Sequence, residues 1–187
     1  MRKLVLLTAF FATCTSWAQI TESVVNKEKF ENSGFSFKGK RVLMVDNISA
    51  SKEENYFVFS KNARDEAQDR LYIEQFTKVD GKWELKVTDE IAESGVVTST
   101  WGSRKAFSDV DKDGKADVIL VYSKHPKGDM DTQLSVVQVL FYKHQMYWIS
   151  SDAASNYTKD TFSNNFKDLP EALKEFALSF WERLDKA

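Results

Sequence analysis

An Asp-Gly pair between two short alternating runs constrains the fold of this chain more than any other feature. Residues 71–76 and 83–87 alternate apolar and polar side chains, and Asp80-Gly81 lies between them. Both central residues of a tight type I′ turn need positive φ, which aspartate and glycine tolerate. The pattern therefore predicts a β-hairpin, and it places the body of the chain in the β class.

Five further segments have the length and the β-branched or aromatic content of strands. They cover residues 41–46, 56–59, 116–122, 134–142 and 146–149. Residues 143–145 are predicted to form the tight turn between the last two. Together with the hairpin, these segments predict a mainly antiparallel sheet structure.

The chain also aligns with itself without a gap when it is shifted by 63 residues. The shift superimposes Asp46 on Asp109, Phe59 on Tyr122, and Leu71, Ile73 and Gln75 on Leu134, Val136 and Gln138. Such a period predicts a duplicated four-stranded antiparallel meander, similar to a propeller blade. The alternative is that two unrelated meanders align by chance, because all alternating strands share a period of two.

We therefore predict one α+β domain over residues 19–187, mainly antiparallel β. The first meander is expected over 41–89, the second over 104–152, and an amphipathic helix over 168–185. Asp168 and Glu171 have the three-residue spacing of a capping box at the start of that helix. Apolar side chains recur along it at helical spacing, so the helix is expected to pack on one face of the sheet.

The segment 109–117 carries four aspartates within nine residues, with a glycine at the sixth position. Carboxylates this close repel one another unless a cation neutralises them. Calcium takes about six to eight oxygen ligands from carboxylates, carbonyls and water, and glycine permits the bend that such a loop needs. The residue at the seventh position would contribute its backbone carbonyl. The predicted metal ligands are Asp109, Asp111, Asp113, Lys115 and Asp117.

This loop differs from an EF-hand. The twelfth position from Asp109 is Leu120, where an EF-hand needs a bidentate glutamate. In the aligned segment of the first unit, Ile48 and Ala50 replace the second and third aspartates, and Ser51 replaces the glycine. We therefore predict one metal site in the chain, with a structural role.

The loop and the apolar strand after it resemble the strand–loop–strand calcium loop of FG-GAP/VCBS repeats. The matching residues are Phe107, Asp109, Asp111, Asp113, Gly114 and Asp117. The resemblance implies that the four aspartates bind calcium through their side chains. It covers about one propeller blade, and two such units cannot close a seven-bladed ring, so the propeller fold itself is not expected.

A longer stretch, Phe107 to Trp181, resembles a family of small exported bacterial proteins labelled as surface-polysaccharide biosynthesis proteins. The resemblance rests on the runs 107–109, 116–118 and 128–130 and on Tyr122. The family pattern Gly-Asp-Val-Ser-Pro is replaced here by Gly-Asp-Met-Asp-Thr at 128–132. This resemblance implies export and a link to surface polysaccharide, and it implies no defined reaction.

The N-terminus is typical of a secretory signal peptide. A short basic start precedes an apolar run over residues 4–13, and small residues precede Gln19. The run of about ten residues is too short to span a bilayer. We predict a signal peptide over 1–18 and an exported protein in the periplasm or outside the cell. The alternative is a lipoprotein anchored through Cys14, although the residues around it fit that motif poorly.

Composition excludes several functional classes. Residues 19–187 contain no cysteine, so they offer no disulfide, thiolate nucleophile or zinc–sulfur site. Loss of residues 1–18 takes the formal charge from −2 to −4, and without a basic stripe nucleic acid is not an expected partner. No later apolar run predicts a transmembrane segment. The sequence also lacks a nucleophile elbow, a phosphate-binding glycine loop and an HExxH pair.

These observations favour a non-enzymatic, calcium-binding protein of the envelope, a binding or scaffold module. Its expected partner is an envelope polysaccharide or another envelope protein. Aromatic side chains that could stack on sugar rings are Trp83, Trp101, Tyr147 and Trp148, although aromatic residues in strands more often pack in cores. Two alternatives stay open: a lipid-anchored surface protein, and a glycan-acting enzyme, which would need two free carboxyl groups about 5–10 Å apart.

Overall fold

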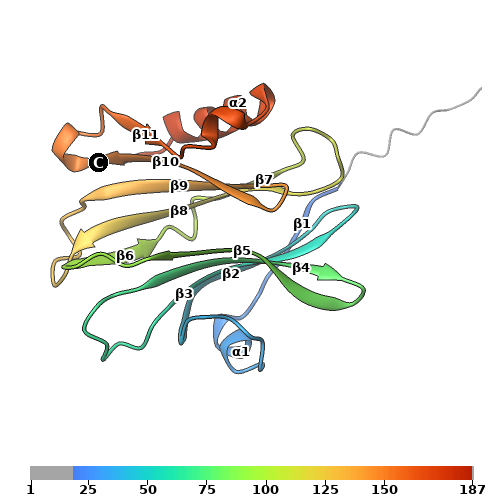
Figure 1. The fold of residues 1–187 in the computed structure, drawn as a ribbon, viewed down its shortest axis with the longest axis horizontal. Coiled ribbons are helices and arrows are strands. Elements are labelled where there is room, and N and C mark those ends of the chain that lie inside the picture. The colour runs from blue at the N-terminus through green and yellow to red at the C-terminus, as the bar shows by residue number, and fades with distance from the viewer. Residues whose placement is uncertain (1–18, 187) are drawn as a thin grey trace, which may run out of the picture.

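The computed structural model describes residues 19–186, which form two antiparallel sheets packed face to face (Figure 1). Sheet A contains, in spatial order, β1 (Thr21–Ser23), β2 (Arg41–Ser49), β3 (Glu54–Lys61), β4 (Leu71–Val79) and β5 (Lys82–Ile91). Sheet B contains, in spatial order, β11 (Asp160–Phe162), β10 (Gln145–Asp152), β9 (Ser135–Tyr142), β8 (Asp117–Pro126) and β6 (Val96–Thr100), and β7 (Ala106–Ser108) pairs with β8. The predicted signal peptide, including Cys14, lies outside the described residues.

Helices cover the two outer faces of the sandwich (Figure 1). α1 (Lys27–Glu31) packs on sheet A and α2 (Glu171–Glu182) on sheet B, and two short 3₁₀ helices, η1 (Ala153–Ser155) and η2 (Phe166–Asp168), precede α2. The prediction of a mainly antiparallel β structure with a C-terminal helix is confirmed. None of the helices in residues 19–186 has the length and apolar character needed to cross a bilayer.

Tight turns fix the register of the two central hairpins. Asp80 and Gly81 have φ of 48° and 77°, which confirms the predicted turn between β4 and β5. Lys143 and His144 have φ of 48° and 59° and join β9 to β10 in the same way. Both central residues of each turn therefore adopt the left-handed conformation that a two-residue hairpin requires.

Three hydrophobic clusters hold these layers together. Between the sheets, Phe57 and Phe59 of β3 pack in one cluster with Leu120 of β8 and its neighbours. A second cluster joins the outer face of sheet B to Leu173 and Trp181 of α2, as predicted from the helical spacing. A third lies around Phe30 of α1 on the outer face of sheet A. Burying each large apolar side chain contributes about 1.5–3 kcal/mol, so the two sheets depend on each other for stability.

The start of α2 differs from the prediction. The helix begins at Glu171, its N-cap is Pro170, and no side chain caps it. Asp168, predicted as the capping residue, instead ends η2. Leu169 is extended, with φ −63° and ψ 142°, because the residue before a proline is biased away from the helical region. The predicted capping box is therefore wrong, and Pro170 sets the helix start.

The strands of the two units lie at corresponding positions in the sequence, as predicted, but one strand pair differs in its register. β3, β4 and β5 lie 63 residues before β8, β9 and β10 to within a few residues. However, β3 pairs Phe59 with Ile73, whereas β8 pairs Tyr122 with Val137 and not with Val136. Because side chains alternate between faces, Ile73 points into the space between the sheets and Val136 points toward α2. A gap-free alignment therefore does not describe β4 and β9.

Candidate metal centre

Three of the predicted ligands come together in the loop between β7 and β8. Asp109, Asp111 and Asp117 each offer one carboxylate oxygen, and these three oxygens lie within 4.8 Å of one another. Asp117 is the first residue of β8, so the strand fixes its position, while Asp109 and Asp111 belong to the loop. All three donors are hard oxygen atoms, which are the ligands that calcium prefers.

Asp113 and Lys115 are not part of this group of three. One carboxylate oxygen of Asp113 accepts a hydrogen bond from the Lys115 amide at 2.9 Å, and the other lies 3.4 Å from the Lys143 ammonium. The predicted role of the Lys115 carbonyl as a ligand stays a prediction. The described geometry thus supplies three carboxylates for a metal, and further ligands would have to come from loop carbonyls, Asp113 or water.

Hydrogen bonds from the loop backbone to its own carboxylates curl the loop. They run from Gly114 N to Asp109 Oδ2 (3.0 Å), from Asp113 N to Asp111 Oδ1 (3.2 Å) and from Val110 N to Asp117 Oδ2 (2.7 Å). Asp109 Oδ1 is buried and has no hydrogen-bond partner among residues 19–186. A buried carboxylate oxygen without a partner is costly, and a bound cation would satisfy it.

Gly114 is required by both conformation and space. Its φ is +88°, and a Cβ atom at this position would lie 2.7 Å from Ser51 Oγ. Its carbonyl accepts hydrogen bonds from the Lys52 amide at 3.0 Å and from Ser51 Oγ at 3.3 Å, and the Lys52 ammonium donates to the Asp113 carbonyl. Hydrogen bonds therefore join the acidic loop of sheet B to the β2–β3 turn of sheet A.

Asp111 has two partners that sequence reasoning missed. The Tyr142 hydroxyl donates to Asp111 Oδ2 at 2.9 Å, and the Lys143 ammonium donates to the same oxygen at 2.8 Å. Burial raises the pKa of Asp111, but these two hydrogen bonds, the hydrogen bond from the Asp113 amide and the charge of Lys143 together hold the pKa below its usual value. Lys143 thus supplies the positive charge at this position, and a bound metal would have to displace it. The only signal for this contact was the β9–β10 turn predicted at 143–145.

Asp117 is the most strongly perturbed acid of the loop. Its side chain is 2% exposed, and burial raises its pKa to about 7 despite the hydrogen bond from Val110. The charges of Asp111 and Asp109 raise the pKa further. A carboxyl group in this environment binds a proton readily at neutral pH, and a divalent cation would compete with that proton.

This pKa makes the stability of the metal-free protein depend on pH. The folded-state pKa of about 7 exceeds the reference value of 3.8, so the folded state binds the proton more tightly than the unfolded state. The resulting stabilisation is complete below about pH 4 and is lost as pH rises through about 7. We expect the melting temperature in chelator to fall from about pH 5 to pH 8, and Asp117→Asn to flatten that fall. The same slope in both proteins would contradict the assignment to Asp117.

The aligned segment of sheet A contains no second acidic loop. Asp46, the counterpart of Asp109, is 4% exposed, and the Lys105 ammonium lies 2.5 Å from one of its oxygens. Ile48, the counterpart of Asp111, is fully buried in the cluster between the sheets. At this position an ammonium group pairs with the buried carboxylate, and Ile48 and Ala50 stand where the acidic loop has its second and third aspartates.

Comparison with known proteins adds no assignment to this geometry. The chain matches no family model, no curated protein and no solved structure. The resemblances to FG-GAP/VCBS calcium loops and to surface-polysaccharide proteins therefore stay predictions from the residues that carry them.

Proposed function

We propose that this chain is an exported calcium-binding protein of the cell envelope, in which one ion stabilises the loop between β7 and β8. The convergence of the Asp109, Asp111 and Asp117 oxygens within 4.8 Å is the observation that supports the proposal best. Export rests on the signal peptide predicted over 1–18. Extracellular calcium modules bind with Kd of about 10⁻⁴–10⁻³ M, which suits a compartment where calcium is abundant.

The donor set fits calcium in two independent ways. The unpartnered Asp109 Oδ1 and the raised pKa of Asp117 are both costs that a divalent cation would remove. The loop offers oxygen donors and no imidazole or thiolate, which transition metals prefer. Magnesium fits less well, because it demands near-octahedral geometry and retains its water ligands.

The proposed role of the ion is structural. The loop contacts the β2–β3 turn through Gly114, Ser51 and Lys52, so an ion in the loop would also stabilise the contact between sheets A and B. The three converging carboxylates would be committed to the ion and could not act as general bases. These arguments favour a binding or scaffold protein over an enzyme at this position.

A cavity beside β5, β10 and β11 supports the proposed link to polysaccharide. It has a volume of about 580 Å³, and its lining includes Trp148, Phe162 and Asn165. Aromatic faces with amide groups nearby suit the apolar and polar sides of a sugar ring. Among the described residues that line it, Asp89 is the one carboxylate. Because glycosidases need two, this cavity favours sugar binding over hydrolysis.

Calcium titration of a Lys143 variant tests the proposed site directly. Lys143→Met removes the ammonium that donates to Asp111, so calcium no longer has to displace it. We expect calcium affinity to rise by roughly two- to fivefold, the range expected for one exposed charge pair. Isothermal titration calorimetry measures the affinity of both proteins.

Lys159→Met is the matched control, because Lys159 is also exposed and lies in the loop before β11. It should leave calcium affinity unchanged. Weaker calcium binding in Lys143→Met than in the wild type would contradict the site, because it would make Lys143 a support for the ion and not a competitor.

A further inference from the structure

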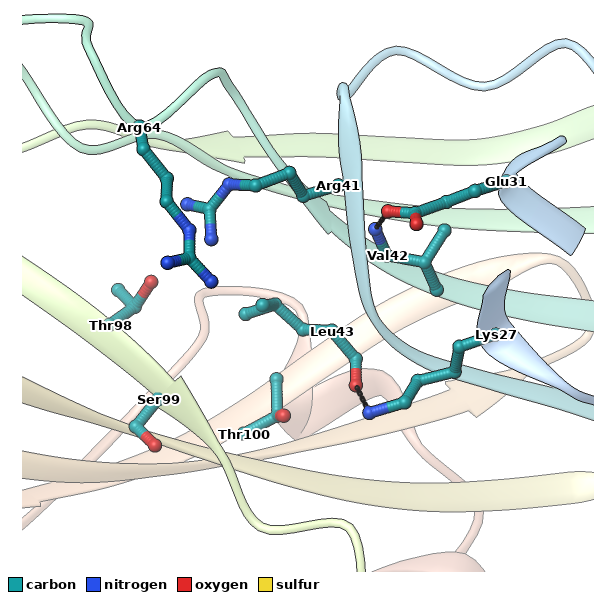
Figure 2. A pocket seen from close by; sticks show the side chains of 9 residues that line it. All are labelled: Lys27, Glu31, Arg41, Val42, Leu43, Arg64, Thr98, Ser99 and Thr100. Carbon is teal, nitrogen blue, oxygen red and sulfur yellow. Dashed lines mark hydrogen bonds between the residues drawn. The ribbon is translucent and has the colours of Figure 1, made fainter. Parts of the chain in front are cut away.

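A second cavity, of about 410 Å³, opens at the edge of the sandwich between α1, β2 and β6 (Figure 2). Its lining includes the cationic side chains Lys27, Arg41 and Arg64 and the hydroxyl side chains Thr98, Ser99 and Thr100. Glu31 is the one carboxylate among the described residues that line it. The wall is therefore positively charged, although the chain as a whole is acidic.

The two arginines direct their guanidinium groups into the same space, opposite Thr98 and Ser99 (Figure 2). Arg41 is positioned by a 3.1 Å hydrogen bond from Nε to the Asn62 carbonyl, which leaves its terminal nitrogens available. Arg64 makes no hydrogen bond to the other residues drawn (Figure 2). Two guanidinium charges in one cavity repel each other, and an anion between them would reverse that repulsion.

Two carboxylates near this cavity, Asp69 and Glu31, are already committed elsewhere. Asp69 Oδ2 lies 2.8 Å from the Lys61 ammonium and accepts hydrogen bonds from the amide and hydroxyl of Thr98 at 3.0 and 3.2 Å. Glu31 accepts a hydrogen bond from the Val42 amide, on the α1 side of β2 and away from the guanidinium groups (Figure 2). Neither acid neutralises the arginine pair.

We propose that this cavity binds an oxyanion, a phosphate or a carboxylate, carried by a small ligand. A guanidinium group presents parallel N–H donors that match both anions, and two such groups facing one cavity can hold opposite sides of the same anion. The hydroxyl of Thr100 adds a neutral donor on the opposite wall. The volume is that of a small-molecule site, so there is room for the body of the ligand beside its anionic group. No lining residue belongs to the acidic loop, and this proposal is independent of calcium.

Titration of the ¹⁵N-labelled protein with inorganic phosphate at constant ionic strength tests the proposal. We expect saturable amide shifts at Leu43, Ser99 and Thr100 with millimolar Kd. Arg64→Gln should weaken binding by about tenfold, because it removes a hydrogen bond between charged groups. Arg64 is exposed, so this variant is expected to keep the fold and its melting temperature.

The matched control is Arg183→Gln, because Arg183 ends α2, which packs on the outer face of sheet B, and is not a lining residue of the cavity. It should bind phosphate as the wild type does. Parallel titrations with D-glucuronate and D-glucose separate the ligand chemistries: a lower Kd for phosphate or for glucuronate identifies the anion, and both results support the site. Shifts that do not saturate, equal binding by glucose, or unchanged binding in Arg64→Gln would overturn it.

Discussion

Millimolar calcium is expected to raise the melting temperature of the protein by about 3–11 °C, and Asp111→Ala to abolish this rise. For a Kd of about 10⁻⁴–10⁻³ M, calcium at about 10 mM would stabilise the folded state by about 1.4–2.7 kcal/mol. In a domain of this size each kcal/mol shifts the melting temperature by about 2–4 °C. Thermal melts followed by circular dichroism, after chelator treatment and with added calcium, measure the difference.

Two controls separate a specific site from general charge screening. Asp131→Ala removes an exposed carboxylate from the β8–β9 loop and should leave the calcium shift intact. Magnesium at the same concentration should stabilise less, because three carboxylates in a curled loop suit its octahedral geometry poorly. A wild-type protein without a calcium shift would refute the metal site, and a shift retained in Asp111→Ala would place calcium elsewhere.

Without metal, the acidic loop lacks partners or compensating charge for some of its carboxylates. The Asp113 amide, the Tyr142 hydroxyl and Lys143 compensate Asp111. However, Asp109 Oδ1 has no partner in the described chain, and the pKa of Asp117 is raised to about 7. These two residual costs arise at the same place. A single divalent ion would remove both of them, whereas protonation of Asp117 removes only one.

The local part of this site could be predicted from the sequence, and its long-range part could not. The spacing of aspartates around Gly114 predicts a curled loop, and it brings three of the four predicted aspartates together. The contacts from Ser51 and Lys143 depend on how two sheets pack and on which turn lies beside β8. The spacing of residues in the sequence does not predict these contacts.

The strands, too, could be predicted only where a local sequence pattern is long enough to be recognised. β4 and β5 could be predicted because the alternation of their side chains and the Asp80-Gly81 turn agree. The short strands β1, β6, β7 and β11 were missed. They contain three to five residues, which is too few to show a recognisable alternation of apolar and polar side chains. The helix start was misplaced because Pro170 acts on the residue before it, and this outweighed the spacing of two acidic residues.

The predicted duplication gains some support from contacts between the two sheets. Phe59 and Tyr122, which are 63 residues apart, pack with ring centroids 6.4 Å apart. Ser51 and Gly114 are also 63 residues apart in the sequence, and they form a hydrogen bond. Aligned residues that touch each other are expected when two copies of one unit pack about a local two-fold axis. The one-residue register difference between β4 and β9 opposes a gap-free repeat. The duplication itself stays a prediction.

Phe57→Ala is expected to lower the free energy of unfolding by about 3–5 kcal/mol, the usual cost of truncating a buried phenylalanine. Phe57 is fully buried, and its ring lies 4.9 Å from that of Phe141 across the two sheets. The surrounding side chains come from both sheets and cannot all collapse into the cavity. The melting temperature should fall by about 6–20 °C, which calorimetry can measure.

Phe162→Ala is the matched control, because Phe162 lies in the edge strand β11 and is 40% exposed. Its ring packs against Phe166 at 4.9 Å, so its loss should cost only about 1 kcal/mol. Similar losses in the two variants would contradict a stability that depends on the contact between the sheets. If the loss is much larger for Phe57→Ala and calorimetry shows one transition with equal calorimetric and van't Hoff enthalpies, sheet A and sheet B unfold as one unit. This is the condition under which calcium bound to the loop of one sheet stabilises both.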